Sequence, residues 1–181
     1  MAEEKVAKRL RRVVKALKKA GEPFAVVGGN AVAAYVARVD LTAVRTTRDI
    51  DVLVRRASLD RISESLEKAG FVRRDVLGSP MFVDSKEMSI RSGIHLIFAG
   101  EKVRAEHPTA APELSDLGES EEGIPIVSLI SLLRMKLNCF RDKDRVHLRD
   151  LLDVGLITPG IEESLPEVLR ERLDNLKRNP E

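Results

Sequence analysis

Cysteine and aromatic residues are scarce in this sequence. Its 181 residues include one Cys, no Trp, one Tyr and five Phe. The single thiol, Cys139, excludes an intramolecular disulfide framework and favours a reducing compartment. So few aromatic rings argue against base stacking as the means of binding nucleic acid, and they predict an aliphatic core.

Long apolar runs are also absent. No stretch approaches the length of a membrane-spanning helix, and the first residues are charged rather than apolar. We therefore expect a cytoplasmic protein without a membrane segment. Hydrophobic residues make up 43% of the chain, which is enough for a core, whereas the formal net charge of +2 excludes no class of partner.

The spacing of apolar residues predicts helices that alternate with strands. Apolar positions four and three residues apart indicate an amphipathic helix over 3–20, which Gly21 and Pro23 end. The other predicted elements are strand 24–27, helix 31–39, a strand with Asp49 and Asp51 that runs to Val54, helix 58–69, strands 71–76 and 81–84 around a turn at 77–80, strand 93–98, and helices that start at Ser128, Lys143 and Pro166.

This order implies an α/β (α+β) protein, in which helices pack on a mixed β-sheet and a small helical unit follows. We expect residues 1–100 to form the α/β core together with the first helix. Residues 101–123 are rich in Glu, Pro and small residues and have no apolar period, so they are expected to form a linker or excursion. Residues 124–181 would form the C-terminal helical part.

The first helix carries a basic face opposite its apolar stripe. This face is interpreted either as an ordinary solvated surface or as an electrostatic contact surface for RNA or another polyanion, and charge alone does not separate the two. The basic residues are Lys5, Lys8, Arg9, Arg11, Arg12, Lys15, Lys18 and Lys19.

A diglycine follows the first predicted strand. Gly28 and Gly29 permit a sharp turn, and Asn30 is placed to cap the helix after it. The free N–H groups at such a helix start suit a phosphate. Glycine turns after strands are also common for purely structural reasons, so the diglycine alone does not establish a phosphate site.

The loop 40–48 adds two arginines near this turn. The guanidinium groups of Arg45 and Arg48 can bind phosphate oxygens in a bidentate way, and Thr46 and Thr47 lie between them. The alternative is a surface loop whose arginines have no such role.

Two carboxylates one residue apart follow this loop. Side chains alternate faces along a strand, so Asp49 and Asp51 point the same way, roughly 6 to 7 Å apart, while Ile50, Val52 and Val54 point toward the core. At that separation the two carboxylates can share a divalent ion. The alternative interpretation is a pair of solvated acids at a strand start.

From Phe24 to Ile157 the sequence resembles the minimal nucleotidyltransferases of the polymerase-β-like superfamily, and in particular the group related to the AbiEii toxins. The resemblance rests on a set of motifs in a fixed order. These are Gly28-Gly29-Asn30 before a helix, Thr47-Arg48-Asp49-Ile50-Asp51-Val52, Met135-Lys136-Leu137, and Arg141-Asp142-Lys143-Asp144 leading to Asp150-Leu151-Leu152.

The resemblance implies roles for individual residues. Asp49 and Asp51 would hold Mg²⁺ or Mn²⁺ against the nucleotide phosphates, because hard oxygen ligands suit these ions. Lys136 would neutralise the triphosphate, and Asp150 would help to build the site; an ordinary snorkelling lysine and a surface acid are the alternatives. The implied nucleotide-binding set is Gly28, Gly29, Asn30, Arg45, Thr47, Arg48 and Lys136.

The sequence departs from the superfamily pattern at one position. These enzymes usually carry a third carboxylate on a later strand, but the strand that fits, 93–98, offers His95. Its imidazole could act as a general base near pH 7 or bind a softer metal than Mg²⁺, or its presence could mark lost activity. Asp84 is a weaker candidate for the missing acid.

The other two histidines give weaker signals. His147 precedes Asp150 by three residues on a predicted helix, which indicates either a site pair or, as we favour, a local hydrogen bond. His107 lies in the predicted linker and has no partner that the sequence identifies. Three scattered histidines and one cysteine do not match a structural zinc site.

Together these features predict a nucleotidyltransferase that moves a nucleoside monophosphate from Mg–NTP to a hydroxyl acceptor, RNA or protein ahead of a small antibiotic. A toxin-like role with a cognate antitoxin protein is an extension of this prediction. The alternatives are a catalytically inactive nucleotide- or protein-binding module of the same fold and an RNA-binding adaptor that uses the basic helix.

Overall fold

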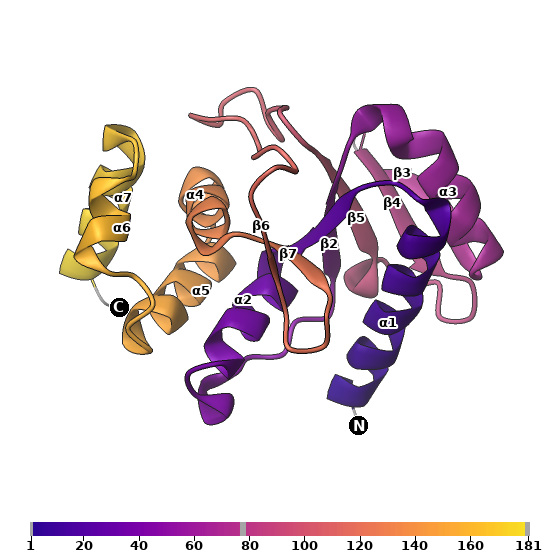
Figure 1. The fold of residues 1–181 in the computed structure, drawn as a ribbon, viewed down its shortest axis with the longest axis horizontal. Helices are drawn as coiled ribbons and strands as arrows, with labels where there is room; N and C mark the ends of the chain where they lie inside the picture. The colour runs from indigo at the N-terminus through magenta and orange to yellow at the C-terminus, as the bar shows by residue number, and fades with distance from the viewer. Residues whose placement is uncertain (1, 77–78, 180–181) are drawn as a thin grey trace.

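The computed structural model describes residues 2–76 and 79–179 (Figure 1). Its helices are α1 (Ala2–Ala20), α2 (Gly28–Ala37), α3 (Leu59–Lys68), α4 (Leu129–Cys139), α5 (Asp142–Asp153), α6 (Pro159–Glu163) and α7 (Glu167–Arg178). Its strands are β1 (Phe24–Val27), β2 (Ile50–Val54), β3 (Phe71–Val76), β4 (Ser79–Asp84), β5 (Ile94–Phe98), β6 (Leu117–Glu119) and β7 (Pro125–Val127).

The strands form one mixed sheet with the order β3-β4-β5-β2-β1-β7-β6. β2 and β5 are parallel, with Asp51 aligned to His95, and β1 and β7 are parallel, whereas β1–β2, β3–β4, β4–β5 and β6–β7 are antiparallel. The predicted α/β class with a mixed sheet and flanking helices is confirmed. The centre of the sheet therefore carries the strands on which the candidate site was predicted.

Helices cover the sheet in two groups. α1 and α3 contact each other at the right of Figure 1, whereas α2, α4 and α5 contact one another toward the left, with α7 against α4. The buried core is mostly Val, Leu and Ile, as predicted, and every residue of β1 is buried. In the described chain no helix is both long and apolar enough to cross a membrane.

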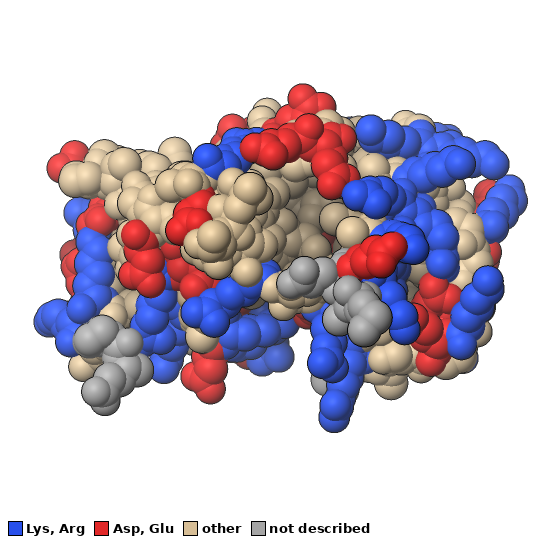
Figure 2. Space-filling view, turned by 90° about the horizontal axis from the view of Figure 1, so that it is seen from below, with Lys and Arg blue, Asp and Glu red and all other residues tan. Residues whose placement is uncertain are grey.

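The basic face of α1 is only partly a solvated surface. Arg9 is 6% exposed and binds Glu87 at 2.7 Å, Arg12 binds Asp84 at 2.8 Å, and Arg11 binds Glu122 at 3.3 Å. Lysines of α1 remain exposed among them, and blue side chains cover the α1 and α3 side at the right of Figure 2. Three arginines of this face therefore bind acids of the same fold, which neither interpretation of the basic face included.

Two strands lie where the sequence analysis expects a turn and a linker. β4 begins at Ser79, inside the predicted turn, and Pro80 is tolerated because it lies near a strand start where β5 pairs with only Met81 and Phe82. Residues 77–78 of that turn lie outside the described residues. β6 lies inside the predicted linker 101–123; it is short and exposed, so it has no apolar pattern that would reveal it.

The C-terminal part contributes to the sheet as well as to the helices. β7 belongs to segment 124–181 and pairs with β1, while α6 fills a stretch for which no helix was predicted. The division into 1–100, 101–123 and 124–181 stays a proposal.

Candidate active site

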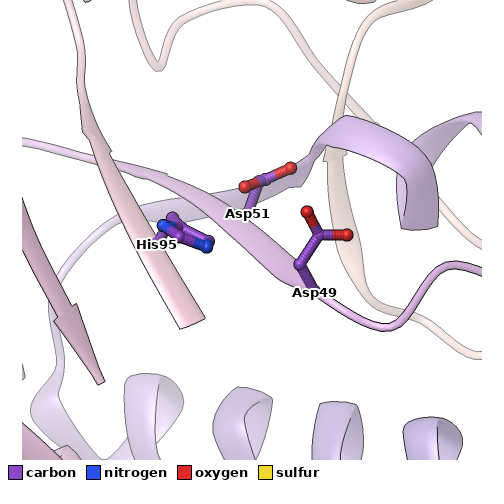
Figure 3. A group of neighbouring side chains, drawn as sticks. All are labelled: Asp49, Asp51 and His95. Carbon is purple, nitrogen blue, oxygen red and sulfur yellow. The ribbon is translucent and has the colours of Figure 1, made fainter. Parts of the chain in front are cut away.

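Two carboxylates and one imidazole converge where β2 and β5 begin. Asp49 immediately precedes β2, Asp51 is its second residue, and His95 is the second residue of β5. Potential ligand atoms of these three side chains all lie within 4.8 Å of one another (Figure 3). The structure thus brings together the predicted acid pair and the histidine. Asp84, the weaker candidate for a third acid, instead forms an ion pair with Arg12.

The two carboxylates have opposite electrostatic environments. Burial disfavours the charge of Asp49, but a hydrogen bond from Thr47 Oγ1 and the nearby Lys143 Nζ, 3.1 Å from Oδ2, bring the pKa of Asp49 below its ordinary value. Burial and the charge of Asp49 raise the pKa of Asp51. Of the groups that the structure describes, none donates a hydrogen bond to the Asp51 carboxylate, so this oxygen pair is available to a cation.

Glycine at positions 28 and 29 is required by close contacts. Gly28 has φ +65°, and a Cβ placed there would lie 2.0 Å from Asp51 Oδ2. A Cβ on Gly29 would lie 2.8 Å from Thr47 Cβ. The diglycine therefore lets the start of α2 approach the carboxylates and the loop before β2.

Asn30 does not cap α2, which corrects the sequence prediction. The helix begins at Gly28, with Val27 at the N-cap position, because the two glycines form its first turn directly after the buried strand. The Asn30 side-chain amide instead donates a hydrogen bond to the backbone oxygen of Asp49 at 2.8 Å. Asn30 thus ties α2 to the chain that carries the first carboxylate.

We expect Gly28→Ala to lower the melting temperature and to remove the nucleotide transfer that the sequence resemblance implies. A non-glycine residue at positive φ costs about 1–2 kcal/mol, and the new methyl group would also displace Asp51. Gly21→Ala is the matched control, since Gly21 has φ +70° but open space around its Cβ position. Thermal unfolding and transfer assays of both variants separate backbone strain from damage to the site; equal activity in both variants would contradict this assignment.

Arg45 and Asp150 bind each other rather than the three converging side chains. Arg45 Nε lies 2.8 and 3.0 Å from the two carboxylate oxygens of Asp150, which is buried. The backbone oxygen of Arg48 accepts a hydrogen bond from Arg9 at 3.2 Å, and the Arg48 side chain is exposed. This places Arg48 on the surface beside Asp49, while Arg45 joins the loop to α5.

Lys136 is buried rather than snorkelling. It is 5% exposed, and its Nζ lies 3.0 Å from Asp144 Oδ1. Asp144 is 1% exposed and also accepts a hydrogen bond from Arg141 Nε at 2.8 Å. Burial disfavours the charged form of Asp144, but these two cations bring its pKa below the ordinary value. The charge of Lys136 also acts to lower the pKa of Asp51.

Two residues of this region were quoted in the sequence motif without a role. Lys143 binds Asp49, and Asp144 binds Lys136, so each of them contacts a predicted site residue directly. The signal available in the sequence was the alternation of charge in Arg141-Asp142-Lys143-Asp144 at the start of a helix.

His147 has neither of its predicted partnerships. Its Nδ1 atom is buried and has no hydrogen-bond partner in the described structure. Burial and the charge of Lys136 lower the pKa of His147 to about 4.

We expect this histidine to make folding sensitive to mild acid. Because its pKa falls from 6.5 to about 4 on folding, its neutral form is fully compatible with the fold above pH 6.5, and stability is lost as the pH falls from 6.5 toward 4. The loss should reach ~1–2 kcal/mol, after allowance for partial exposure. Urea unfolding at pH 7.5 and 4.5 should show a smaller loss for His147→Gln than for the wild type, and an equal loss would refute the assignment.

The mixed sheet, with two carboxylates at the start of its central strand β2 beside a glycine-led helix, defines a nucleotidyltransferase fold. A sequence model of the family described as "Uncharacterised nucleotidyltransferase" matches residues 1–158, and the chain belongs to this family. The expectation of an enzyme is confirmed at the level of the family. A comparison with curated proteins found no match.

Solved structures give the same fold. The solution structure of the antibiotic-resistance factor ANT(2'')-Ia has 14% sequence identity and a TM-score of 0.50, over 100% of this chain and 86% of that chain. The crystal structure of ANT(2'')-Ia in complex with adenylyl-2''-tobramycin also has 14% identity and a TM-score of 0.50, over 98% of this chain and 99% of that chain. At this identity the likeness shows the fold.

Proposed function

We propose that this nucleotidyltransferase moves a nucleoside monophosphate from an NTP to a hydroxyl acceptor at Asp49, Asp51 and His95. The observation that carries the proposal is the convergence of these three side chains within 4.8 Å at the start of β2 and β5. In the reaction, the acceptor oxygen forms a bond to the α-phosphorus and the bond to the β-phosphate oxygen breaks. Pyrophosphate leaves, and the hydroxyl proton passes to His95 or to solvent.

The residues around the three side chains support binding of the triphosphate. The start of α2 at Gly28 and Gly29 presents backbone N–H groups, and Arg48 is exposed beside Asp49. Lys143 and the buried Lys136 add positive charge to the same region. Asn30 and Thr47 hold Asp49, and Arg45 and Asp150 fix the loop, so these residues would position the site.

The donor set fits a divalent cation, Mg²⁺ or Mn²⁺. Asp51 has no hydrogen-bond donor among the described residues, and Asp49 is neutralised by a single lysine. Asp49 and Asp51 would hold the ion. When bound, it polarises the α-phosphate and offsets the charge that develops on the phosphate oxygens.

For the acceptor we propose RNA or protein in a toxin-like reaction related to that of the AbiEii group, in the cytoplasm and under control of a cognate antitoxin protein. Support comes from the sequence motifs and from the exposed lysines of α1. A hydroxylated antibiotic is the remaining acceptor class, since the neighbouring ANT(2'')-Ia structure contains adenylyl-2''-tobramycin.

The test is incubation of the protein with each α-³²P-labelled NTP, Mg²⁺ or Mn²⁺, and a cell extract, with tobramycin in a parallel reaction. Label in an RNA or protein band with the wild type, and none with Asp51→Asn, would support transfer and name the acceptor class. Label on tobramycin alone would overturn the toxin-like proposal.

A non-catalytic nucleotide-binding module is the second candidate, because His95 stands where the superfamily has an acid. Absence of label with every NTP and both ions, together with nucleotide binding in calorimetry, would establish it. RNA binding that is salt-sensitive and survives Asp49→Asn/Asp51→Asn would instead indicate the adaptor function.

A further inference from the structure

His95 and Asp51 lie directly beside each other on parallel strands. The register of β2 and β5 aligns these two residues, and the two strands hold both side chains on one face of the sheet, where Figure 3 shows them next to Asp49. Because both strands are central in the sheet, their spacing is fixed by backbone hydrogen bonds on each side. The imidazole is therefore positioned by the fold rather than by a mobile loop.

Nothing within the described part of the chain competes for this imidazole. No described group forms a hydrogen bond or ion pair with the His95 ring, and the side chain is half-buried rather than part of the core. Asp51 likewise accepts no hydrogen bond from a described residue. Two adjacent side chains with unused ligand atoms, held by neighbouring strands, form a preorganised pair of ligands.

The mixture of ligands determines which cation this pair prefers. Mg²⁺ strongly favours oxygen ligands and gives up its water reluctantly. First-row transition ions accept imidazole nitrogen much more readily, and Mn²⁺ also accepts carboxylate oxygen. A histidine at position 95 replaces an oxygen ligand by a nitrogen ligand, which Mg²⁺ accepts less readily than Mn²⁺ does.

We propose that His95 is a metal ligand that makes this site select Mn²⁺ over Mg²⁺. The role of the bound ion in the reaction rests on the proposed function. The preference for Mn²⁺ over Mg²⁺ is a property of the protein that can be measured without the reaction. It assigns His95 to metal binding instead of proton transfer, because its ligand atom lies within 4.8 Å of both carboxylates.

Lys143 sets the condition for binding. Its ammonium group lies 3.1 Å from Asp49 Oδ2, so it competes with an incoming cation for this carboxylate. Lys143 is half-exposed, and its side chain is long enough to turn away without a change in the backbone. The same competition acts on every divalent ion, so it does not create the preference.

The test measures ion binding without turnover. Mn²⁺ is added to the nucleotide-free protein, and bound ion is followed by the loss of the electron paramagnetic resonance signal of free Mn²⁺, with Mg²⁺ as competitor. We expect Mn²⁺ to bind at least about tenfold more tightly than Mg²⁺, and His95→Asp to reduce this ratio by about tenfold. Pulsed spectroscopy should detect nitrogen coupling to the bound Mn²⁺ in the wild type but not in His95→Asp.

His147→Gln is the matched control, because it removes an imidazole outside the three converging side chains and should keep both the ratio and the nitrogen coupling. Equal ratios in the wild type and His95→Asp, or no nitrogen coupling in the wild type, would overturn the proposal. The outcomes also separate the two proposals. Nitrogen coupling without nucleotide transfer would refute the proposed function alone, whereas transfer without nitrogen coupling would refute the ligand role alone.

Discussion

Asp51→Asn should strongly reduce nucleotide transfer and raise the melting temperature of the same protein. Transfer should fall by about a thousandfold, because loss of metal-bound charge stabilisation removes several kcal/mol and each 1.4 kcal/mol is a factor of ten. Stability should rise because the half-buried Asp51 lies beside Asp49, has a raised pKa and accepts no hydrogen bond from a described residue. An amide of the same shape removes that buried charge.

The pH dependence gives a second check on this variant. The pKa of Asp51 is higher in the folded protein than its ordinary value of 3.8, so its deprotonation above the folded pKa destabilises the fold. As the pH falls through the folded pKa toward 3.8, this penalty disappears from the wild type, and the stability gap between the two proteins should narrow. Urea unfolding of both proteins without metal, over this range, measures the gap. Full transfer activity or a lower melting temperature in the variant would contradict the assignment.

Asp144→Ala should be the most destabilising of the substitutions considered. Asp144 is 1% exposed and accepts hydrogen bonds from Lys136, from the Arg141 side chain and from the Arg141 backbone. Its removal leaves the Lys136 ammonium buried without its partner, which costs about 3–5 kcal/mol. Urea unfolding should show this loss, whereas Asp142→Ala, at an exposed acid in the same turn, should change stability by less than about 0.5 kcal/mol.

A double variant distinguishes the structural role of this pair from a role in substrate binding. Lys136→Met combined with Asp144→Leu replaces both buried charges by apolar groups of similar size and should recover most of the stability. If Lys136 also neutralises the triphosphate, the folded double variant should show a raised KM for NTP. An unchanged KM would limit Lys136 to a structural role, and a loss of stability as large as that of Asp144→Ala would refute the pairing argument.

The sequence predicted the parts of the site that depend on local pattern. The alternation of a strand places Asp49 and Asp51 on one side, and the diglycine marks a close approach that the structure explains by contact with Asp51 and Thr47. Convergence of His95 with the acids follows from strand pairing between β2 and β5, which no local pattern encodes. The resemblance identified position 95 as a candidate, and the register of β2 and β5 shows that His95 is aligned with Asp51.

The errors concern residues whose partners are distant in the chain. Arg9 and Arg12 were indistinguishable from solvated lysines until the fold brought Glu87 and Asp84 against them. The burial of Lys136 could not be predicted, because Asp144, its partner, lies on the next helix. Asn30 was predicted to cap the helix because Asn is a common N-cap residue, but the backbone oxygen of Asp49, 19 residues away, accepts its hydrogen bond.

The pairing of β1 with β7 determines when the surroundings of the candidate site can form during synthesis of the chain. β1 lies at the N-terminal end of the chain, yet Val26 aligns with Ile126, and Lys143 on the following α5 reaches Asp49 across 94 residues. A growing chain on the ribosome therefore carries Asp49, Asp51 and His95 long before it has the neighbouring strand and the lysines that complete their surroundings. The surroundings of these three side chains can therefore be completed only after residue 143 has been synthesised and the long-range contacts have formed.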